Sequence, residues 1–293
     1  MSFKSGFVNI IGNPNVGKST LMNALTGEQM SIITNKAQTT RHRILGIVNG
    51  DNFQIVFSDT PGILKPKYRL QESMMGFVRS AMSDADVILY VTDVVETPDK
   101  NEDYVNRIAD TDTPVLLLIN KIDITDPASL EKIADMWRSR VPNATIFPVS
   151  AKEGFQVNEV FERVLELLPE GPAYFPQDEM TDRPQRFFVS EILREKIFLN
   201  YKEEVPYCTE VVVESFKEEE SIIRVQAVIL TERNSQKGIL IGKNGSALKR
   251  TNTQARIDME KFFGKKIYLE VFVKVEPDWR NNERNLRSLG YIE

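Results

Sequence analysis

The chain has 293 residues, more than a single hydrophobic core usually serves, so two domains are expected. Its composition, 41% hydrophobic and 27% charged residues, is typical of globular proteins, and the one cysteine, Cys208, excludes an internal disulfide framework. No run approaches the ~18 consecutive apolar residues of a membrane-spanning helix, and no secretory signal is visible, so we expect a cytoplasmic protein.

The charge is unevenly distributed along the chain. The formal net charge is -5, with 17 Lys and Arg against 22 Asp and Glu in residues 1–173, and 20 against 20 in residues 174–293. A net acidic chain does not favour binding of nucleic acid along its whole surface. Any basic surface is therefore expected in the second part.

A glycine-rich loop organises the first part. Phe7–Ile11 predicts a buried parallel strand and Thr20–Thr26 a helix, and the residues between them follow the pattern G-x-x-x-x-G-K-[ST]. In this setting backbone N–H groups and a helix N-terminus surround phosphate groups. A chance glycine loop is the alternative, which the flanking strand and helix disfavour. The candidate nucleotide-binding residues here are Gly12, Asn13, Pro14, Asn15, Val16, Gly17, Lys18, Ser19 and Thr20.

The residue types in this loop match the chemistry of a phosphate site. Gly12 and Gly17 let the backbone approach phosphate oxygens without an intervening Cβ atom. Lys18 can reach the β- and γ-phosphates, and the Ser19 hydroxyl can ligate Mg²⁺.

Strands and helices alternate through the first part, which predicts an α/β P-loop domain with a mostly parallel sheet and helices on both faces. The expected strands are Phe7–Ile11, Arg43–Val48 as an antiparallel edge, Phe53–Phe57, Val87–Thr92, Val115–Asn120 and Thr145–Val149. The expected helices are Thr20–Thr26, Tyr68–Met82, Asn101–Ala109, Leu130–Val141 and Gln156–Leu168. Ligands of such sheets bind at the carboxyl ends of the strands.

A D-x-P-G sequence follows the third of these strands. Asp59 is placed to hold Mg²⁺, usually through water, and Gly62 can present its N–H to the γ-phosphate; Thr60 and Pro61 lie between them. A plain turn is the alternative, but the spacing from the glycine loop favours the phosphate site.

The polar segment Lys36–Arg43 lies between the glycine loop and Asp59. Thr40, with Thr39 as its rival, can ligate Mg²⁺ and sense the γ-phosphate, so this segment could order with a nucleoside triphosphate and loosen with the diphosphate. A polar surface loop is the alternative. Nothing specific supports His42 as a base, and Arg41 is interpreted as a solvated loop residue rather than an internal charge stabiliser.

Asn120-Lys121-Ile122-Asp123 has the pattern N-K-x-D after an apolar strand, which predicts guanine specificity. The Asp123 carboxylate can accept hydrogen bonds from guanine N1–H and the 2-amino group, whereas adenine would leave a buried carboxylate unpaired. The Lys121 stem can lie along the base, and Asn120 can tie this segment to the glycine loop. Three later residues form a weaker candidate loop, in which the N–H of Ala151 meets guanine O6: Ser150, Ala151 and Lys152.

Ile63 occupies the position where Ras-like enzymes carry a water-orienting Gln. An apolar side chain cannot orient or deprotonate water, so slow intrinsic hydrolysis is expected. Lys18, Thr40 and Gly62 are the candidates for transition-state support. Asn15 could ligate K⁺ beside the β- and γ-phosphates, as in related GTPases with this loop; the alternative is that it caps loop backbone.

A proline-rich break from Pro169 to Pro176 predicts an interdomain linker, with a loop inside one domain as the alternative. The expected division is a GTP-binding domain over 1–173, a linker over 174–182, and a second domain with a tail over 183–293. The second domain is predicted to contain a helix over Arg183–Glu203, strands over Thr209–Lys217 and Ser221–Leu230, a helical segment before a G-x-x-G loop, a helix over Ala247–Phe263 and a strand over Ile267–Val275.

This order is that of an α+β type II KH domain, whose G-x-x-G loop clamps the backbone of four nucleotides of single-stranded RNA. Between positions 233 and 266 there are nine basic residues, opposed only by Asp258 and Glu260. That excess favours phosphate binding over a simple helix-joining turn. The candidate RNA-binding residues are Ile241, Gly242, Lys243, Asn244, Gly245, Lys249 and Arg250. Trp279 in the polar tail is expected to pack on the domain rather than stack on a base.

The motifs GNPNVGKS, QTTRHR, DTPG, NKID, SAK and IGKNGSALK, in this order, resemble those of the Era family of bacterial Ras-like GTPases with a C-terminal KH domain. The resemblance covers nearly the whole chain. It implies GTP and GDP binding with Mg²⁺, binding to the 3′ region of 16S rRNA, and assistance in maturation of the 30S subunit. It also implies a cytoplasmic protein with peripheral contact with the inner membrane, and a monomer is expected.

Two classes of function follow. The first is a GTP-switched RNA-binding assembly factor, and the alternative is a GTPase whose C-terminal domain docks on a protein or membrane partner. Salt-dependent binding of single-stranded RNA, weakened by Gly242→Asp, would separate them. An ATP-dependent enzyme is a more distant option that nucleotide competition would test.

Overall fold

The computed structural model describes residues 2–292, which divide into two compact units. The first comprises the described residues up to Pro66 together with Met74–Asp182. The second comprises Lys67–Ser73 together with the described residues from Arg183 onward. No helix among the described residues has the length and apolar character needed to cross a membrane.

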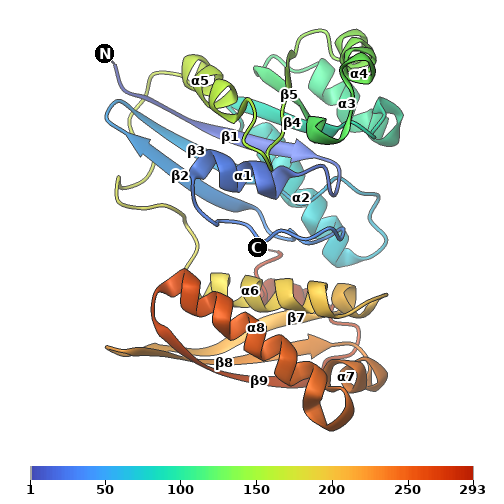
Figure 1. The fold of residues 1–293 in the computed structure, drawn as a ribbon, viewed down its shortest axis with the longest axis vertical. Coiled ribbons are helices and arrows are strands. Elements are labelled where there is room, and N and C mark those ends of the chain that lie inside the picture. Colours follow the sequence, from blue (N-terminus) through green and yellow to red (C-terminus); the bar gives the residue numbers. More distant parts are fainter. Residues whose placement is uncertain (1, 293) are drawn as a thin grey trace. The chain divides into compact units, whose positions relative to one another are not determined.

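The first unit is built on a six-stranded sheet of order β2-β3-β1-β4-β5-β6 (Figure 1). Its strands are β1 (Lys4–Gly12), β2 (Ile44–Gly50), β3 (Phe53–Asp59), β4 (Val87–Asp93), β5 (Val115–Asn120) and β6 (Thr145–Pro148). All neighbours pair in parallel except β2, which runs antiparallel to β3 at one edge. The predicted mostly parallel sheet with an antiparallel edge strand is confirmed.

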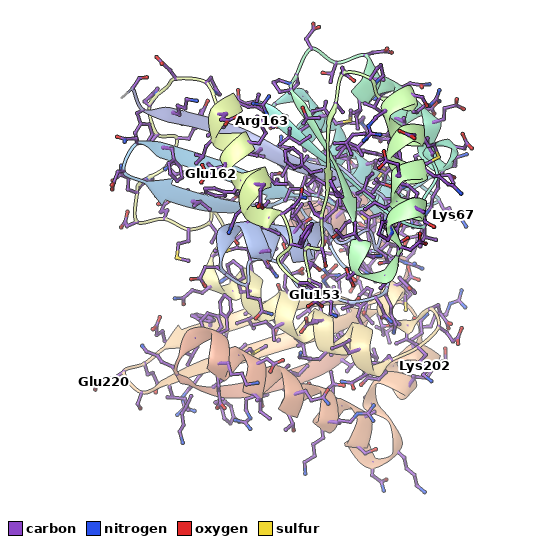
Figure 2. The ribbon with its side chains drawn as sticks, turned by 45° about the horizontal axis from the view of Figure 1, so that its top comes forward. Lys67, Glu153, Glu162, Arg163, Lys202 and Glu220 are labelled. Carbon is purple, nitrogen blue, oxygen red and sulfur yellow. The ribbon has the colours of Figure 1, made fainter. Side chains whose placement is uncertain are left out.

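Helices cover both faces of this sheet. They are α1 (Lys18–Thr26), α2 (Arg69–Ser83), α3 (Glu102–Ala109), α4 (Pro127–Arg140) and α5 (Val157–Leu167), with short 3₁₀ turns η1 (Pro98–Asn101) and η2 (Ile122–Ile124). Side chains of α1 and α5 share one core with Val8, Ile10 and Leu89. Tyr90, adjacent to Leu89 and so on the opposite face, packs against Trp137 of α4, with ring centroids 5.8 Å apart. Figure 2 labels Glu162 and Arg163 on α5.

The proline-rich segment after α5 is hydrogen-bonded to β3 and to the edge strand β2 of the first unit. Gln54, which is fully buried, accepts hydrogen bonds from the N–H groups of Tyr174 (2.7 Å) and Phe175 (2.9 Å). Farther along, the N–H of Ile47 in β2 donates to the carbonyl of Met180 at 2.8 Å. Much of the segment expected as a linker is therefore anchored to this sheet by backbone groups.

The second unit has the predicted KH order. It contains α6 (Gln185–Asn200), η3 (Val205–Cys208), β7 (Glu210–Glu218), β8 (Ile222–Thr231), α7 (Asn234–Ile241), η4 (Lys243–Gly245), α8 (Ser246–Phe263), β9 (Lys266–Val275) and α9 (Glu283–Ser288). The sheet order is β7-β8-β9, antiparallel between β7 and β8 and parallel between β8 and β9. Helices α6 and α8 pack together on one face of this sheet (Figure 1), and Glu220 marks the turn between β7 and β8 (Figure 2).

The tail packs against this unit, as expected. Trp279 is fully buried, and its indole N–H donates to the carbonyl of Cys208 at 2.9 Å. The hydroxyl of Tyr291 donates to Glu210 at 2.6 Å. The short helix α9 between these aromatic residues was not predicted.

Candidate functional site: a nucleotide cleft and a G-x-x-G groove

The glycine loop connects β1 to α1 in a conformation that excludes side chains at two positions. A Cβ atom on Gly12 would lie 2.1 Å from the carbonyl oxygen of Val91. Gly17 has φ of +99°, and a Cβ atom there would lie 2.2 Å from the side-chain nitrogen of Asn120. Glycine is therefore required at both positions for the loop to close around a ligand.

Lys18 is held inside this loop. Its ammonium group donates to the carbonyl of Asn13 at 2.8 Å. Burial lowers the pKa of Lys18 to about 8, and the nearby carboxylates of Asp59 and Glu96 partly oppose this shift. The negative charge of a polyphosphate would favour the protonated lysine, so ligand binding and lysine protonation are coupled.

Three oxygen-bearing side chains converge beside the loop. The Ser19 hydroxyl donates to Asp59 at 2.7 Å and lies 3.0 Å from the hydroxyl of Thr40. Burial raises the pKa of Asp59, although Lys18 and the hydroxyl groups around it oppose the rise. Its Oδ1 atom is buried without a well-formed hydrogen bond among the described residues. Mg²⁺ prefers hard oxygen ligands, and this group of oxygen atoms, which includes the Asp59 Oδ1 atom, fits that preference.

The structure distinguishes the two threonines of the segment Lys36–Arg43. Thr40 lies beside Ser19 and Asp59, whereas Thr39 donates to the carbonyl of Lys36 at 2.7 Å. Arg41 is fully buried, so its interpretation as a solvated loop residue was wrong. The His42 ring contacts Phe77 at 5.9 Å between centroids, which gives no support to a role as a base.

The D-x-P-G turn lies directly against the glycine loop. The hydroxyl of Thr60 donates to the carbonyl of Ile10 at 2.7 Å. The N–H of Ile63 donates to the carbonyl of Gly12 at 3.1 Å. A Cβ atom on Gly62 would lie 2.7 Å from Pro14, so only glycine allows this approach. The Ile63 side chain is 2% exposed, and at that position there is no polar group to orient water.

The N-K-x-D residues join the base side of the cleft to the glycine loop. Asn120 donates to the carbonyl of Val16 at 2.8 Å and accepts from the N–H of Ala151 at 3.0 Å. A guanine O6 atom at Ala151 would therefore have to share or replace this second bond. Lys121 donates to the carbonyl of Asn15 at 2.6 Å.

Asp123 is exposed in this structure rather than buried, so the base itself would have to cover it. Its carboxylate accepts a hydrogen bond from Ser150 at 2.7 Å, and this bond is the main cause of a lowered pKa of Asp123. The carboxylate is therefore ionised at neutral pH, as an acceptor of two donor groups needs to be.

Sequence reasoning missed two carboxylates at the end of β4. Asp93 accepts from Lys121 at 2.8 Å and from the N–H groups of Val95 (3.0 Å) and Glu96 (3.1 Å). Glu96 in turn accepts from the Asn13 side chain at 2.9 Å. This connection links the base segment to the glycine loop. The available signal was the position of Asp93 at the carboxyl end of a parallel strand, where ligands of such sheets bind.

These elements enclose a cleft of about 470 Å³. Its lining comes from the glycine loop and start of α1, the segment from Ile32 to Thr40, Gly62 and Lys121. The glycine loop, the candidate magnesium ligands Ser19 and Thr40, and Lys121 of the base segment therefore face one space, which is of a size suited to a nucleotide.

The second candidate site lies where α7 meets α8. Gly242, Asn244 and Gly245 have φ values of +72°, +51° and +76°, and a Cβ atom on Gly242 would lie 2.6 Å from that of Ala247. Beside this turn is a groove of about 380 Å³. Its lining residues are Gly245, Leu248, Lys249, Asn252, Thr253, Arg256 and Leu269. Lys243 and Arg250 are exposed outside this lining, and Ile241 packs partly against the core.

Comparison with known proteins agrees with both sites. Residues 7–121 match the family of 50S ribosome-binding GTPases, and residues 204–280 match the KH domain. The GTPase Era of Geobacter metallireducens is 46% identical over 293 residues, covering 99% of this chain and 98% of the relative.

Two solved structures are also similar along the whole chain. One is Era in complex with MgGDPNP and nucleotides 1506–1542 of 16S ribosomal RNA, with a TM-score of 0.94 and 40% identity, covering 99% of this chain and 100% of that one. The other is an Aquifex aeolicus Era variant bound to GDP and AlF4⁻, with a TM-score of 0.94, 40% identity and the same coverage.

Proposed function

This chain belongs to the Era family of GTPases, and from that premise we propose that it is a GTP-driven switch that binds single-stranded RNA in the 3′ region of 16S rRNA. The proposed process is maturation of the 30S subunit. The observation that carries the proposal is the presence, in one chain, of a guanine-type nucleotide cleft and a G-x-x-G groove with basic side chains. The similar Era structure holds both MgGDPNP and nucleotides 1506–1542 of 16S ribosomal RNA.

In the cleft, the protein supplies position and charge. Asp123 fixes the base, and Asn120 ties the base segment to the glycine loop. Backbone groups of the glycine loop and Lys18 hold the phosphates, and Gly62 can approach the γ-phosphate. Ser19, Thr40 and Asp59 are the residues that would hold Mg²⁺, which neutralises phosphate charge. Because Ile63 offers no polar group, hydrolysis by the isolated protein is proposed to be slow.

Asn15 is proposed as a ligand for K⁺. It has φ of +66° and its side-chain amide donates to the carbonyl of Asn35 at 3.2 Å, so it joins the glycine loop to the segment that carries Thr40. Faster hydrolysis in KCl than in NaCl, with the difference lost in Asn15→Ala, is the expected result. Equal rates in the two salts would remove the K⁺ assignment.

The experiment that tests the RNA assignment replaces both central residues of the G-x-x-G loop. Lys243→Asp/Asn244→Asp should weaken single-stranded RNA binding at least tenfold by placing negative charge at the phosphate backbone. Ala128→Asp/Lys132→Asp on exposed α4 makes the same change in net charge and serves as the control. Equal losses in the two variants would favour the alternative, a C-terminal domain that docks on protein or on the membrane surface.

The proposed location is the cytoplasm, with peripheral contact with the inner membrane and a monomeric state. Support for these assignments comes from the family alone.

A further inference from the structure

The face of the β7-β8-β9 sheet opposite α6 and α8 carries two exposed aromatic side chains. Along β9, Ile267, Leu269, Val271 and Val273 face the core formed with the helices. The alternate residues face the other way, and among them Tyr268 is 52% and Phe272 48% exposed. Core packing therefore does not account for these two rings.

Strand register places basic and polar groups beside the rings. Arg224 pairs with Tyr268 and Val228 with Phe272, so each pair shares this open face. The Arg224 guanidinium lies 5.5 Å from the centroid of the Tyr268 ring, and Gln226 donates to Glu270 at 3.3 Å. These contacts confirm that the side chains lie on one surface.

The exposed charges of this open face are mainly basic. Lys217, Arg224, Lys266 and Lys274 are exposed, against Glu214 and Glu270, while Glu210 at one end is buried beneath Tyr291. Arg224 pairs with Glu219 and Lys274 with Glu276, both at 3.0 Å. Within residues 2–292, no ion pair within 4 Å involves Lys217 or Lys266. The N–H of Ile267 and, to a smaller extent, the charge of Lys266 help to lower the pKa of Glu260. Among the same residues no such carboxylate neighbour is found for Lys217, which is the cation of this face most open to an anionic ligand.

The open face is continuous with the G-x-x-G groove. Strand β9 is at the edge of the sheet, and its residue Leu269 lines the groove on the helix side. Tyr268 is the adjacent residue and points to the other side of the same edge strand. A nucleic acid strand that leaves the groove across β9 therefore meets the aromatic rings directly.

We propose that this open face is a second binding surface for single-stranded RNA, on which unpaired bases stack against Tyr268 and Phe272. Exposed aromatic rings on a sheet, with basic side chains for the backbone, are how proteins hold unpaired bases. A contiguous exposed apolar patch would instead favour protein docking. Here Val228 is only 7% exposed, and Glu270 separates the two rings. The inference rests on the proposed RNA binding in the groove and extends it.

The test compares two RNAs on the full-length protein. One is a single-stranded oligonucleotide of about four nucleotides, which fills the G-x-x-G groove alone, and the other extends it to about twelve. Tyr268→Ala/Phe272→Ala should weaken binding of the longer RNA roughly tenfold, in fluorescence anisotropy, and leave the affinity for the shorter RNA within about twofold.

The control variant is Leu199→Ala/Ile257→Ala, which also removes two exposed apolar side chains, 55% and 41% exposed, from the helix side of the same unit. It should bind both RNAs as the wild type does. If Tyr268→Ala/Phe272→Ala left the affinity for both RNAs unchanged, or lowered both affinities equally, the proposal would be overturned.

Two further outcomes are informative. Unchanged binding of both RNAs with weaker binding to purified 30S subunits would show that the two rings contact another part of the subunit, and would also overturn the proposal. Failure of the wild type to bind the shorter RNA, together with loss of longer-RNA binding in the variant, would refute the groove assignment and leave the open face as the RNA site.

Discussion

Replacing Asp123 by asparagine should change which base the cleft binds. In the structure the carboxylate is ionised, oriented by Ser150 at 2.7 Å, and open to a ligand. Guanine offers it two donors, N1–H and the 2-amino group. Asparagine can accept from only one of them, and its own amide donor would oppose the other.

The expected loss can be estimated from these two hydrogen bonds. A hydrogen bond to a charged group contributes about 1.5–3 kcal/mol. Because Asp123 is exposed before the base binds, the lower value is appropriate, which gives about 3 kcal/mol for the pair, or roughly a hundredfold in affinity. Xanthine carries an oxygen in place of the 2-amino group, so the side-chain amide introduced by Asp123→Asn would donate to it.

The assay is displacement of a fluorescent guanine nucleotide by GDP, ADP and XDP. Wild-type protein should prefer GDP, and Asp123→Asn should prefer XDP, with GDP weakened roughly a hundredfold. Asp103→Asn, an exposed carboxylate in α3, is the control and should behave as wild type. GDP affinity unchanged by Asp123→Asn, or equal binding of GDP and ADP by the wild type, would refute the reasoning.

Three other predictions follow from single buried groups. Without nucleotide the pKa of Lys18 is about 8, and phosphate binds the protonated form, so GDP affinity should fall roughly fourfold from pH 7 to 8.5. Lys18→Arg should not show this fall. An affinity of the wild type for GDP that does not change with pH would contradict the assignment of Lys18 to the phosphates. Gln54→Leu removes the acceptor of the Tyr174 and Phe175 N–H groups, so the segment after α5 should be cleaved faster in limited proteolysis, and an unchanged cleavage rate would contradict this anchoring role. Trp279→Phe leaves the Cys208 carbonyl without its indole donor. The free energy of unfolding of the second unit, measured in urea, should therefore fall by about 1–3 kcal/mol. An unfolding curve with the same midpoint and slope as the wild type would show that the hydrogen bond contributes nothing to stability.

Much of the fold could be predicted from the sequence because local pattern and global arrangement agree. The apolar runs Val115–Asn120 and Val87–Thr92 are too short for helices and lie between helical patterns, so a parallel sheet was the consistent solution, and the structure has β5 over Val115–Asn120. The G-x-x-G loop was recognisable because its glycines fall between two helical segments, and the structure gives both of them positive φ.

Other features depend on contacts between distant residues, which no local pattern encodes. Glu96 reaches the glycine loop through Asn13, 83 residues away in the chain. Gln54 anchors residues 120 positions later, so a segment that resembles a free linker is held to the sheet. Arg41 has the sequence context of a solvated loop, yet it is fully buried. Lys67–Ser73 likewise belongs to the second unit, although the rest of that unit begins more than 100 residues later in the chain.

The measurement that tests the central claim most directly is the affinity for single-stranded RNA from the 3′ end of 16S rRNA, determined with GDP and then with a non-hydrolysable GTP analogue. If the protein is a GTP-driven RNA switch, the RNA should bind more tightly in the GTP-analogue state, and by reciprocity the RNA should tighten binding of the analogue by the same factor. Equal RNA affinity in the two nucleotide states would contradict the switch, even with a functional cleft and a functional groove.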